Sequence, residues 1–245
     1  MKLLVTGGDG FIGSNFILHT LKNSPKTEII NLDAGFYGSN KLSLEEISNY
    51  DNYKFVKGNI NDSIIVDDLI SKCDAVINFA AESFVDRSIA DAKPFLRSNI
   101  DGVFTILESI KKHKKKFLQI STDEVFGSLD IESASETFQY NPSSPYAATK
   151  ACAEMLVNSY HITYDCDTLI TRCTNNYGPR QFPEKLIPKT LLLAKNNKKI
   201  PIYGTGKNLR DWLYVTDHCD AILSCLHHGK SGESYNISSG NEIDN

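Results

Sequence analysis

The feature that most constrains the fold of this 245-residue chain is a glycine-rich stretch directly after its first apolar run. Residues 2–6 are short and apolar, as expected of a buried parallel strand, and residues 11–23 carry apolar side chains at roughly helical spacing. Between them Gly7, Gly10 and Gly13 recur at every third position. Glycine allows a tight turn and close approach of the backbone to a phosphate, to which the first N–H groups of a helix can donate. The stretch predicts a strand–turn–helix unit that cradles a dinucleotide; a plain glycine turn in an α/β protein is the alternative.

Strand-like and helix-like segments alternate along the rest of the chain. Short apolar runs predict strands, and longer runs with helical spacing predict helices. The expected strands are residues 28–32, 53–56, 75–79, 117–121 and 167–171, and the expected helices are residues 64–71, 99–113 and 145–160. This alternation favours an α/β fold, a Rossmann-type doubly wound parallel sheet with helices on both faces.

The character of the sequence changes after Asn175, where Gly, Pro and Asn become frequent. We expect residues 1–174 to form the dinucleotide-binding Rossmann domain, with residues 212–238 returning to it. Residues 175–211 and 239–245 are then expected to form part of a smaller substrate-binding lobe.

The composition excludes several classes of protein. Hydrophobic residues make up 41% and charged residues 23% of the chain, as in a folded globular protein. No apolar run approaches the ~18 residues of a membrane-spanning helix, so no membrane partner is expected. With 26 Lys and Arg against 30 Asp and Glu, the net charge of −4 gives no electrostatic reason to bind nucleic acid. The six cysteines lack zinc-ligand spacing, so no metal is expected, and free thiols favour a reducing, cytoplasmic location.

An acidic residue sets the expected cofactor. Asp33 ends the second expected strand, twenty residues beyond Gly13. A carboxylate there can accept hydrogen bonds from both ribose hydroxyl groups of a dinucleotide, and it would repel a 2′-phosphate. Ala34 and Gly35 follow, so no adjacent arginine would neutralise such a phosphate. The sequence therefore favours NAD over NADP.

Two further groups of residues are candidates for acid–base chemistry. Tyr146 and Lys150 are four residues apart in an expected helix, so they share one face. The lysine ammonium group would stabilise a tyrosinate, which could then act as a base near neutral pH. Thr122, Asp123 and Glu124 directly follow an expected strand, at the edge where ligands bind in such sheets. Neighbouring carboxyl groups can be pushed to different pKa values, one serving as acid and the other as base.

Both patterns also have a structural interpretation. A Tyr–Lys pair on a helix is usually a surface pairing, and two acidic residues after a strand can belong to a loop with a helix cap. The occurrence of both beside a dinucleotide motif favours the catalytic interpretation.

Taken with other motifs, these residues show a resemblance. The sequence resembles the extended short-chain dehydrogenase/reductase family and, within it, the nucleoside-diphosphate-glucose 4,6-dehydratases of the dTDP-glucose type. The resemblance covers essentially all 245 residues. The matching stretches are residues 6–14, 80–88, 121–127, 144–146, 175–179, 182–188 and 210–215. A Thr-Asp-Glu sequence at this position distinguishes such dehydratases from epimerases, which usually carry other residues there.

The resemblance implies NAD-dependent 4,6-dehydration of a nucleoside-diphosphate-glucose to the 4-keto-6-deoxy sugar nucleotide, a step toward deoxysugars such as rhamnose. It implies that Tyr146, tuned by Lys150, takes the C4 hydroxyl proton while NAD⁺ takes the C4 hydride, and that Thr122 positions the C4 oxygen. Glu124 then removes the C5 proton, Asp123 protonates the C6 hydroxyl as water leaves, and the hydride returns to C6. dTDP-glucose is the favoured substrate, and UDP-glucose stays open.

The resemblance also implies binding residues and a partner. NAD is expected to contact Gly7, Gly10, Phe11, Ile12, Gly13, Asp33, Asn59, Ile60, Ala80, Ala81, Ser121, Tyr146, Lys150 and Asn176. The nucleotide-sugar is expected to contact Ser83, Thr122, Asn175, Lys185, Leu186, Pro201, Ile202, Tyr203, Arg210 and Asn245. A homodimer is expected through a four-helix interface built from residues 95–113 and 146–162.

The sequence departs from the family pattern at three places. Phe84 stands where histidine is common, which removes a polar group near the site. Asn59 stands where aspartate is usual, although its amide oxygen can still accept the same hydrogen bond. Relatives continue beyond Asn245, so we expect a substrate lobe that is truncated at its C-terminal end. Two alternatives therefore stay open: a nucleotide-sugar 4-epimerase, which the adjacent acids disfavour, and a catalytically silent protein that binds NAD or a sugar nucleotide.

Overall fold

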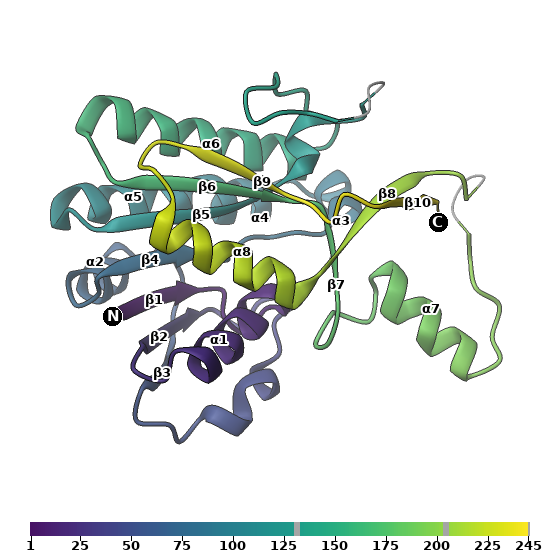
Figure 1. Cartoon of the computed structure of the whole chain (residues 1–245), viewed down its shortest axis with the longest axis horizontal. Helices are drawn as coiled ribbons and strands as arrows, with labels where there is room; N and C mark the ends of the chain where they lie inside the picture. The colour runs from purple at the N-terminus through teal and green to yellow at the C-terminus, as the bar shows by residue number, and fades with distance from the viewer. Residues whose placement is uncertain (130–132, 203–205, 245) are drawn as a thin grey trace.

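A seven-stranded sheet, parallel throughout, organises the computed structural model, which describes residues 1–129, 133–202 and 206–244. Its strand order is β3-β2-β1-β4-β5-β6-β9 (Figure 1). The strands are β1 Lys2–Thr6, β2 Glu28–Asp33, β3 Tyr53–Lys57, β4 Ala75–Asn78, β5 Lys116–Thr122, β6 Thr168–Cys173 and β9 Ser234–Ile237. The expected doubly wound α/β fold is confirmed, and each expected strand agrees with the structure to within two residues at either end.

Helices cover both faces of this sheet because alternate strand residues point to opposite sides. On one face Leu3, Val5 and Leu118 pack in a core with α1 Phe11–Asn23 and α8 Val215–His228. On the other face Leu4, Val76 and Phe117 pack in a core with three helices, α2 Ser63–Ser71, α5 Gly102–His113 and α6 Pro145–Tyr164. No helix among the described residues combines the length and the hydrophobicity that a membrane span requires.

The expected helix over residues 99–113 is wrong at its start. The chain is already helical in α3 Val85–Ala90 and α4 Lys93–Leu96, and a π-helical turn over Arg97–Asp101 leads into α5. Asn99 in this turn is buried, and its side chain bonds the backbone N–H and C=O of Glu82 at 2.9 and 3.0 Å. These bonds fix the loop after β4, and helical spacing of apolar residues could not reveal them.

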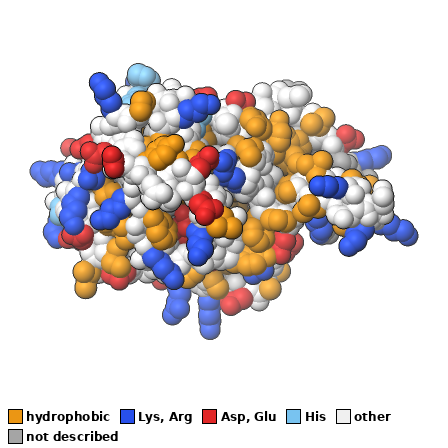
Figure 2. Space-filling view, turned by 90° about the horizontal axis from the view of Figure 1, so that it is seen from below, with side chains coloured by type: hydrophobic (Ala, Val, Ile, Leu, Met, Phe, Trp, Pro, Cys, Tyr) orange, Lys and Arg blue, Asp and Glu red, His pale blue; other side chains and the backbone are white. Residues whose placement is uncertain are grey.

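A smaller three-stranded sheet stands beside the main one. It contains β7 Asn175–Tyr177, β8 Leu209–Tyr214 and β10 Glu242–Asp244, with β7 and β8 parallel and β8 and β10 antiparallel. The helix α7 Leu186–Lys195 has no buried residue. Figure 2 shows that one part of the molecule projects from the main body and that hydrophobic side chains gather where this part meets the body. After β8 the chain returns through α8 and β9 to the main sheet. The division into two domains stays a prediction.

Candidate active site

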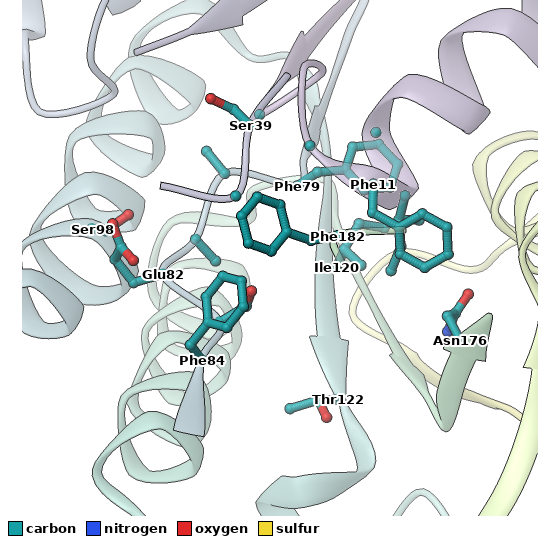
Figure 3. A pocket seen from close by; sticks show the side chains of 18 of the residues that line it. Phe11, Ser39, Phe79, Glu82, Phe84, Ser98, Ile120, Thr122, Asn176 and Phe182 are labelled. Carbon is teal, nitrogen blue, oxygen red and sulfur yellow. The ribbon is translucent and has the colours of Figure 1, made fainter. Parts of the chain in front are cut away.

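A cavity of about 430 Å³ lies at the carboxyl ends of the parallel strands, where ligands bind in doubly wound sheets (Figure 3). It is lined by the β1–α1 turn, the ends of β2 and β5, the start of α6 and the segment around β7. Residues from the expected catalytic set and from both expected binding sets line this one cavity, namely Gly7, Gly10, Phe11, Ile12, Gly13, Asp33, Asn59, Ile60, Ala80, Ala81, Ser83, Ser121, Thr122, Asp123, Glu124, Tyr146, Lys150, Asn175, Asn176, Lys185 and Leu186.

The glycines of the β1–α1 turn serve different purposes. Gly7 has a φ of +71°, and a Cβ there would lie 2.6 Å from the backbone nitrogen of Ala80. A Cβ on Gly13 would lie 2.4 Å from the carbonyl oxygen of Gly7, so neither Gly7 nor Gly13 has room for a side chain. A Cβ on Gly10 would meet only that same oxygen, at 3.1 Å. Gly10 is the N-cap of α1 and lines the cavity, so its missing side chain keeps the helix N-terminus open to a pyrophosphate.

Two buried carboxyl groups lie at the end of β2. Asp33 accepts hydrogen bonds from the backbone N–H groups of Asp9 at 3.0 Å and Gly35 at 2.8 Å, and burial raises its pKa. Asp9 accepts from the Asn31 side chain at 2.8 Å; burial and then the charge of Asp33 raise its pKa. The sequence analysis missed Asp9, since nothing in the pattern sets it apart from other turn residues. A second acidic group here adds to the barrier against a 2′-phosphate.

The Thr-Asp-Glu sequence forms the first turn after β5. Thr122 ends the strand, and Asp123–Phe126 is a short 3-10 helix. The Thr122 hydroxyl accepts from the Glu124 N–H at 3.2 Å and donates to Asp123 Oδ1 at 3.2 Å, so it also caps this turn. Burial and then repulsion by Glu124 raise the pKa of Asp123 to about 6. Asp123 is therefore suited to hold and donate a proton.

The start of α6 fixes the position of Tyr146. Ser144 is the N-cap, and its hydroxyl accepts from the Ala147 N–H at 3.1 Å. The Tyr146 N–H donates to the Ser88 hydroxyl at 3.1 Å, which joins α6 to α3. Lys150 lies one turn further along α6 and is buried. Both side chains reach the cavity, as the spacing predicts.

The electrostatics of this pair differ from the expectation. Burial raises the pKa of the Tyr146 hydroxyl, and neighbouring groups that include Glu124 add to the rise. Burial also lowers the pKa of Lys150, to about 8, and its ammonium group donates to the Ile120 carbonyl at 2.6 Å. The net effect of the surroundings is therefore to raise the pKa of Tyr146, and the Lys150 ammonium group is bonded to a backbone carbonyl. A positively charged nicotinamide ring would favour the tyrosinate.

A buried ion pair behind the site escaped the sequence analysis. Glu154, one turn beyond Lys150, is fully buried and accepts from Arg172 Nε at 2.8 Å, from Tyr140 Oη at 2.9 Å and from the Ser121 hydroxyl. The charge of Glu154 opposes the effect of burial on the pKa of Lys150. The only signal for it was an acidic residue four positions after the lysine, which is common on exposed helices.

Asn176 is held from behind by a buried histidine. His218 on α8 is fully buried, and its Nδ1 lies 2.8 Å from Asn176 Oδ1. The Asn176 amide also donates to the Thr174 carbonyl at 3.0 Å. Burial lowers the pKa of His218 to about 4, so the imidazole is neutral at neutral pH.

Three of the expected substrate contacts that the structure describes do not line the cavity. Pro201 and Ile202 are exposed beyond α7, and the Arg210 guanidinium is exposed and donates to the carbonyl of its neighbour Leu209 at 2.7 Å. Tyr203 and Asn245 lie outside the described residues. The roles of these residues stay predictions.

The cavity also contains aromatic and polar residues that the sequence analysis did not assign. They are Phe36, Tyr37, Phe79, Glu82, Ser98, Gln181, Phe182 and Trp212, and they are joined by Phe84, which was noted only as a departure. They come from several separate segments, which include the π-helical turn at Ser98 and strand β8 at Trp212, so only the fold brings them together. Among the described residues, no group of three or more His, Cys, Asp or Glu side chains could hold a metal ion.

Comparison with known proteins decides the family. The family described as GDP-mannose 4,6 dehydratase matches residues 4–245. The chain belongs to this family. The low-salt glycan biosynthesis protein Agl12 of Haloferax volcanii is 48% identical, over 100% of this chain and 79% of that protein. The dTDP-glucose 4,6-dehydratase of Streptomyces niveus is 45% identical, over 100% of this chain and 74% of that enzyme.

Solved structures agree with this membership. DesIV, a dTDP-glucose 4,6-dehydratase from Streptomyces venezuelae crystallised with NAD and TYD bound, has a TM-score of 0.97 and 42% identity, over 100% of this chain and 78% of that one. A UDP-glucuronic acid 4-epimerase from Bacillus cereus also has the fold, with a TM-score of 0.94, but only 29% identity, over 100% of this chain and 79% of that one. The resemblance to the dehydratases of the extended short-chain dehydrogenase/reductase family is confirmed.

The glycine turn gives a first prediction. We expect Gly10→Ala to weaken NAD binding about tenfold or more, about 1.4 kcal/mol, because its methyl group enters the phosphate cradle, while the melting temperature changes little. Gly13→Ala should lower both, because its Cβ would lie 2.4 Å from the Gly7 carbonyl oxygen. Isothermal titration and thermal unfolding of both variants separate the two effects. Equal losses of stability would contradict the assignment of Gly10 to the ligand.

His218 gives a prediction about pH. Its pKa is about 4 in the folded protein against an ordinary 6.5, so between these values only the unfolded chain binds the proton. This difference in proton binding has no effect on the free energy of unfolding above pH 6.5. As the pH falls from 6.5 toward 4 it lowers the free energy of unfolding, by about 3 kcal/mol in full. We expect His218→Asn, which keeps a donor for Asn176, to lose this part of the pH dependence. Urea unfolding between pH 4.5 and 7.5 measures it, and the exposed His228→Asn is the matched control.

Proposed function

We propose that this chain catalyses the NAD-dependent 4,6-dehydration of a nucleoside-diphosphate-glucose, with dTDP-glucose as the favoured substrate. The observation that carries the proposal is the presence of Asp123 and Glu124 in the same cavity as Tyr146 and the glycine turn. Oxidation of a hydroxyl group needs a dinucleotide and one base. Elimination of water needs a further acid and a further base, and this cavity holds both. The dTDP-glucose 4,6-dehydratases among its relatives support the same reaction.

The residues of the cavity fit NAD. The open helix N-terminus at Gly10 suits a pyrophosphate, and the Asp33 carboxylate suits the hydroxyl groups of a ribose. Bound NAD supplies an acceptor that takes a hydride from C4 and later returns it to C6. Side chains of the protein must then transfer three protons: one from the C4 hydroxyl, one from C5 and one to the C6 hydroxyl.

Tyr146 and Thr122 serve the oxidation. Tyr146 takes the proton of the C4 hydroxyl, and the Thr122 hydroxyl, which favours the ionised form of Tyr146, orients the C4 oxygen. The positive charge of Lys150 lies on the same side of the helix and favours the tyrosinate once it forms.

Asp123 and Glu124 serve the elimination. The 4-keto group acidifies the C5 hydrogen, which Glu124 removes as a proton, and Asp123 gives its proton to the C6 hydroxyl as water leaves. The pKa of about 6 at Asp123 supports this division, because a carboxyl group whose pKa is raised toward neutrality is protonated more often than an ordinary aspartate and can act as the acid. The product is the 4-keto-6-deoxy sugar nucleotide.

The reaction is tested by mass spectrometry of the sugar nucleotide. Purified protein is incubated with dTDP-glucose and, separately, with UDP-glucose. A product lighter by one water supports the dehydratase, and the faster substrate identifies the base. An isomer of unchanged mass would instead indicate a 4-epimerase. Unchanged substrate from protein that still binds NAD would indicate a silent binding protein.

Glu124 provides a sharper prediction within this reaction. We expect Glu124→Gln to slow the release of water by about 10²–10⁴-fold, as for loss of a general base, while NAD binding is retained. Glu45→Gln removes an exposed carboxylate far from the cavity and should leave the rate unchanged. A wild-type rate in Glu124→Gln would remove this residue from the mechanism.

We also propose a homodimer formed through α5 and α6, and a cytoplasmic location in keeping with six free thiols. Phe104 on α5 and Met155 and Ile162 on α6 expose large apolar side chains, which a four-helix interface would cover. Light scattering should give the mass of two 27.3-kDa chains. Phe104→Asp should shift this mass toward one chain, whereas Ile64→Asp, which changes an exposed side chain on α2, should not. A monomeric wild type would contradict the dimer.

A further inference from the structure

Three aromatic rings from separate segments meet at the cavity. Tyr37 follows β2, Phe84 precedes α3 and Phe182 precedes α7. Their centroids lie 5.2 Å apart for Tyr37 and Phe84, 5.0 Å for Tyr37 and Phe182, and 5.7 Å for Phe84 and Phe182, all edge to face. All three line the cavity, and Figure 3 shows Phe84 and Phe182 beside each other within it. We call these three residues the aromatic clasp.

Charged groups hold the clasp from both sides. The Arg87 guanidinium lies 3.3 Å above the Tyr37 ring centroid, and the Lys185 ammonium lies 4.4 Å from the Phe84 centroid. The Tyr37 hydroxyl donates to the Glu184 carboxylate. This bond raises the pKa of Tyr37, so the hydroxyl keeps the proton that it donates. The bond from Tyr37 to Glu184 thus joins the loop after β2 directly to the segment before α7.

This junction matters because the segment it holds has few other attachments. The following helix α7 has no buried residue. Arg180 donates to the Ser43 carbonyl at 3.2 Å and to the Glu46 carboxylate at 3.1 Å, and both of these bonds are exposed to solvent. Arg180 also donates to Asn15 Oδ1 at 3.3 Å, and the Asn15 amide donates to the Pro179 carbonyl at 2.9 Å. Nearer to α7, Lys185 donates to the Ser83 carbonyl at 3.4 Å. The loop after β2 also contains Gly35, whose backbone N–H donates a hydrogen bond to the Asp33 carboxyl group. Movement of the clasp rings apart would therefore open the cavity on the dinucleotide side.

We propose that Tyr37, through its hydrogen bond to Glu184, keeps the aromatic clasp closed and retains the reduced dinucleotide until its hydride is returned. The inference rests on the proposed function, in which the hydride taken from C4 must return to C6 of the same sugar. A reduced cofactor that leaves between these two steps ends the turnover. Tyr37 acts here as a positioning residue, since it moves no proton of the substrate.

The test measures cofactor release without any sugar substrate. NADH bound to the protein is chased with excess NAD, and the loss of bound NADH fluorescence gives the dissociation rate. Tyr37→Phe keeps the ring and removes only the hydroxyl, so we expect release to be about three- to tenfold faster, as for the loss of one hydrogen bond. Tyr50→Phe changes an exposed tyrosine outside the cavity and should release NADH at the wild-type rate.

A double variant tests the path through Glu184. If the two residues act through one bond, Tyr37→Phe combined with Glu184→Ala releases NADH no faster than Glu184→Ala alone. With dTDP-glucose present, Tyr37→Phe should also leave more free NADH per molecule of product. Equal NADH release by wild type and Tyr37→Phe would overturn the inference. A wild type that binds NADH but removes no water from dTDP-glucose would overturn the proposed function instead, and the two failures are thereby distinguished.

Discussion

The rest of the structure depends on the close packing of the β1–α1 turn against its neighbours. Gly7 leaves no room for a side chain beside the backbone of Ala80, at the end of β4. The N–H of Gly8 donates to the Asn31 side chain on β2 at 3.1 Å, and a Cβ at Gly8 would lie 2.3 Å from that acceptor. The strands β1, β2 and β4 are therefore held together by one turn. The position of Asp33 is fixed because the backbone N–H of Asp9 in the same turn donates to its carboxyl group.

Beside this turn, burial is the main cause of the shifted pKa values of the candidate acid–base residues. Asp123 and Lys150 are both pushed toward their neutral forms by burial, and each keeps one specific partner, the Thr122 hydroxyl and the Ile120 carbonyl. In the interior, the Glu154 carboxyl group accepts hydrogen bonds from Arg172, from the Tyr140 hydroxyl and from the Ser121 hydroxyl. Replacing a buried ion pair by apolar residues of the same volume is often neutral or stabilising, so the pair is weak evidence for stability alone. Here the ion pair joins α6 to β6, and the bond from the Ser121 hydroxyl to Glu154 joins the end of β5 to α6.

The two walls of the cavity are held by different forces. The dinucleotide side is fixed by backbone packing, which tolerates almost no displacement. The side that leads to α7 is fixed by ring contacts, cation–π contacts and a few exposed polar bonds. Such contacts are weaker than the packing of backbone against backbone, so this wall is the part of the cavity that a single substitution can loosen.

The sequence by itself determined six of the seven strands of the main sheet, the glycine turn and the candidate acid–base residues, because each depends on local patterns. Gly7 and Gly13 recur at fixed spacing, and Asp123 and Glu124 directly follow an apolar run. Only the tertiary structure decided that Tyr146 lies half-buried in one cavity with these carboxyl groups, that Glu154 faces Arg172, and that Tyr37 reaches Glu184. Those pairs are separated by up to 147 residues, and the electrostatic effect of each depends on desolvation and distance, which no spacing in the chain encodes.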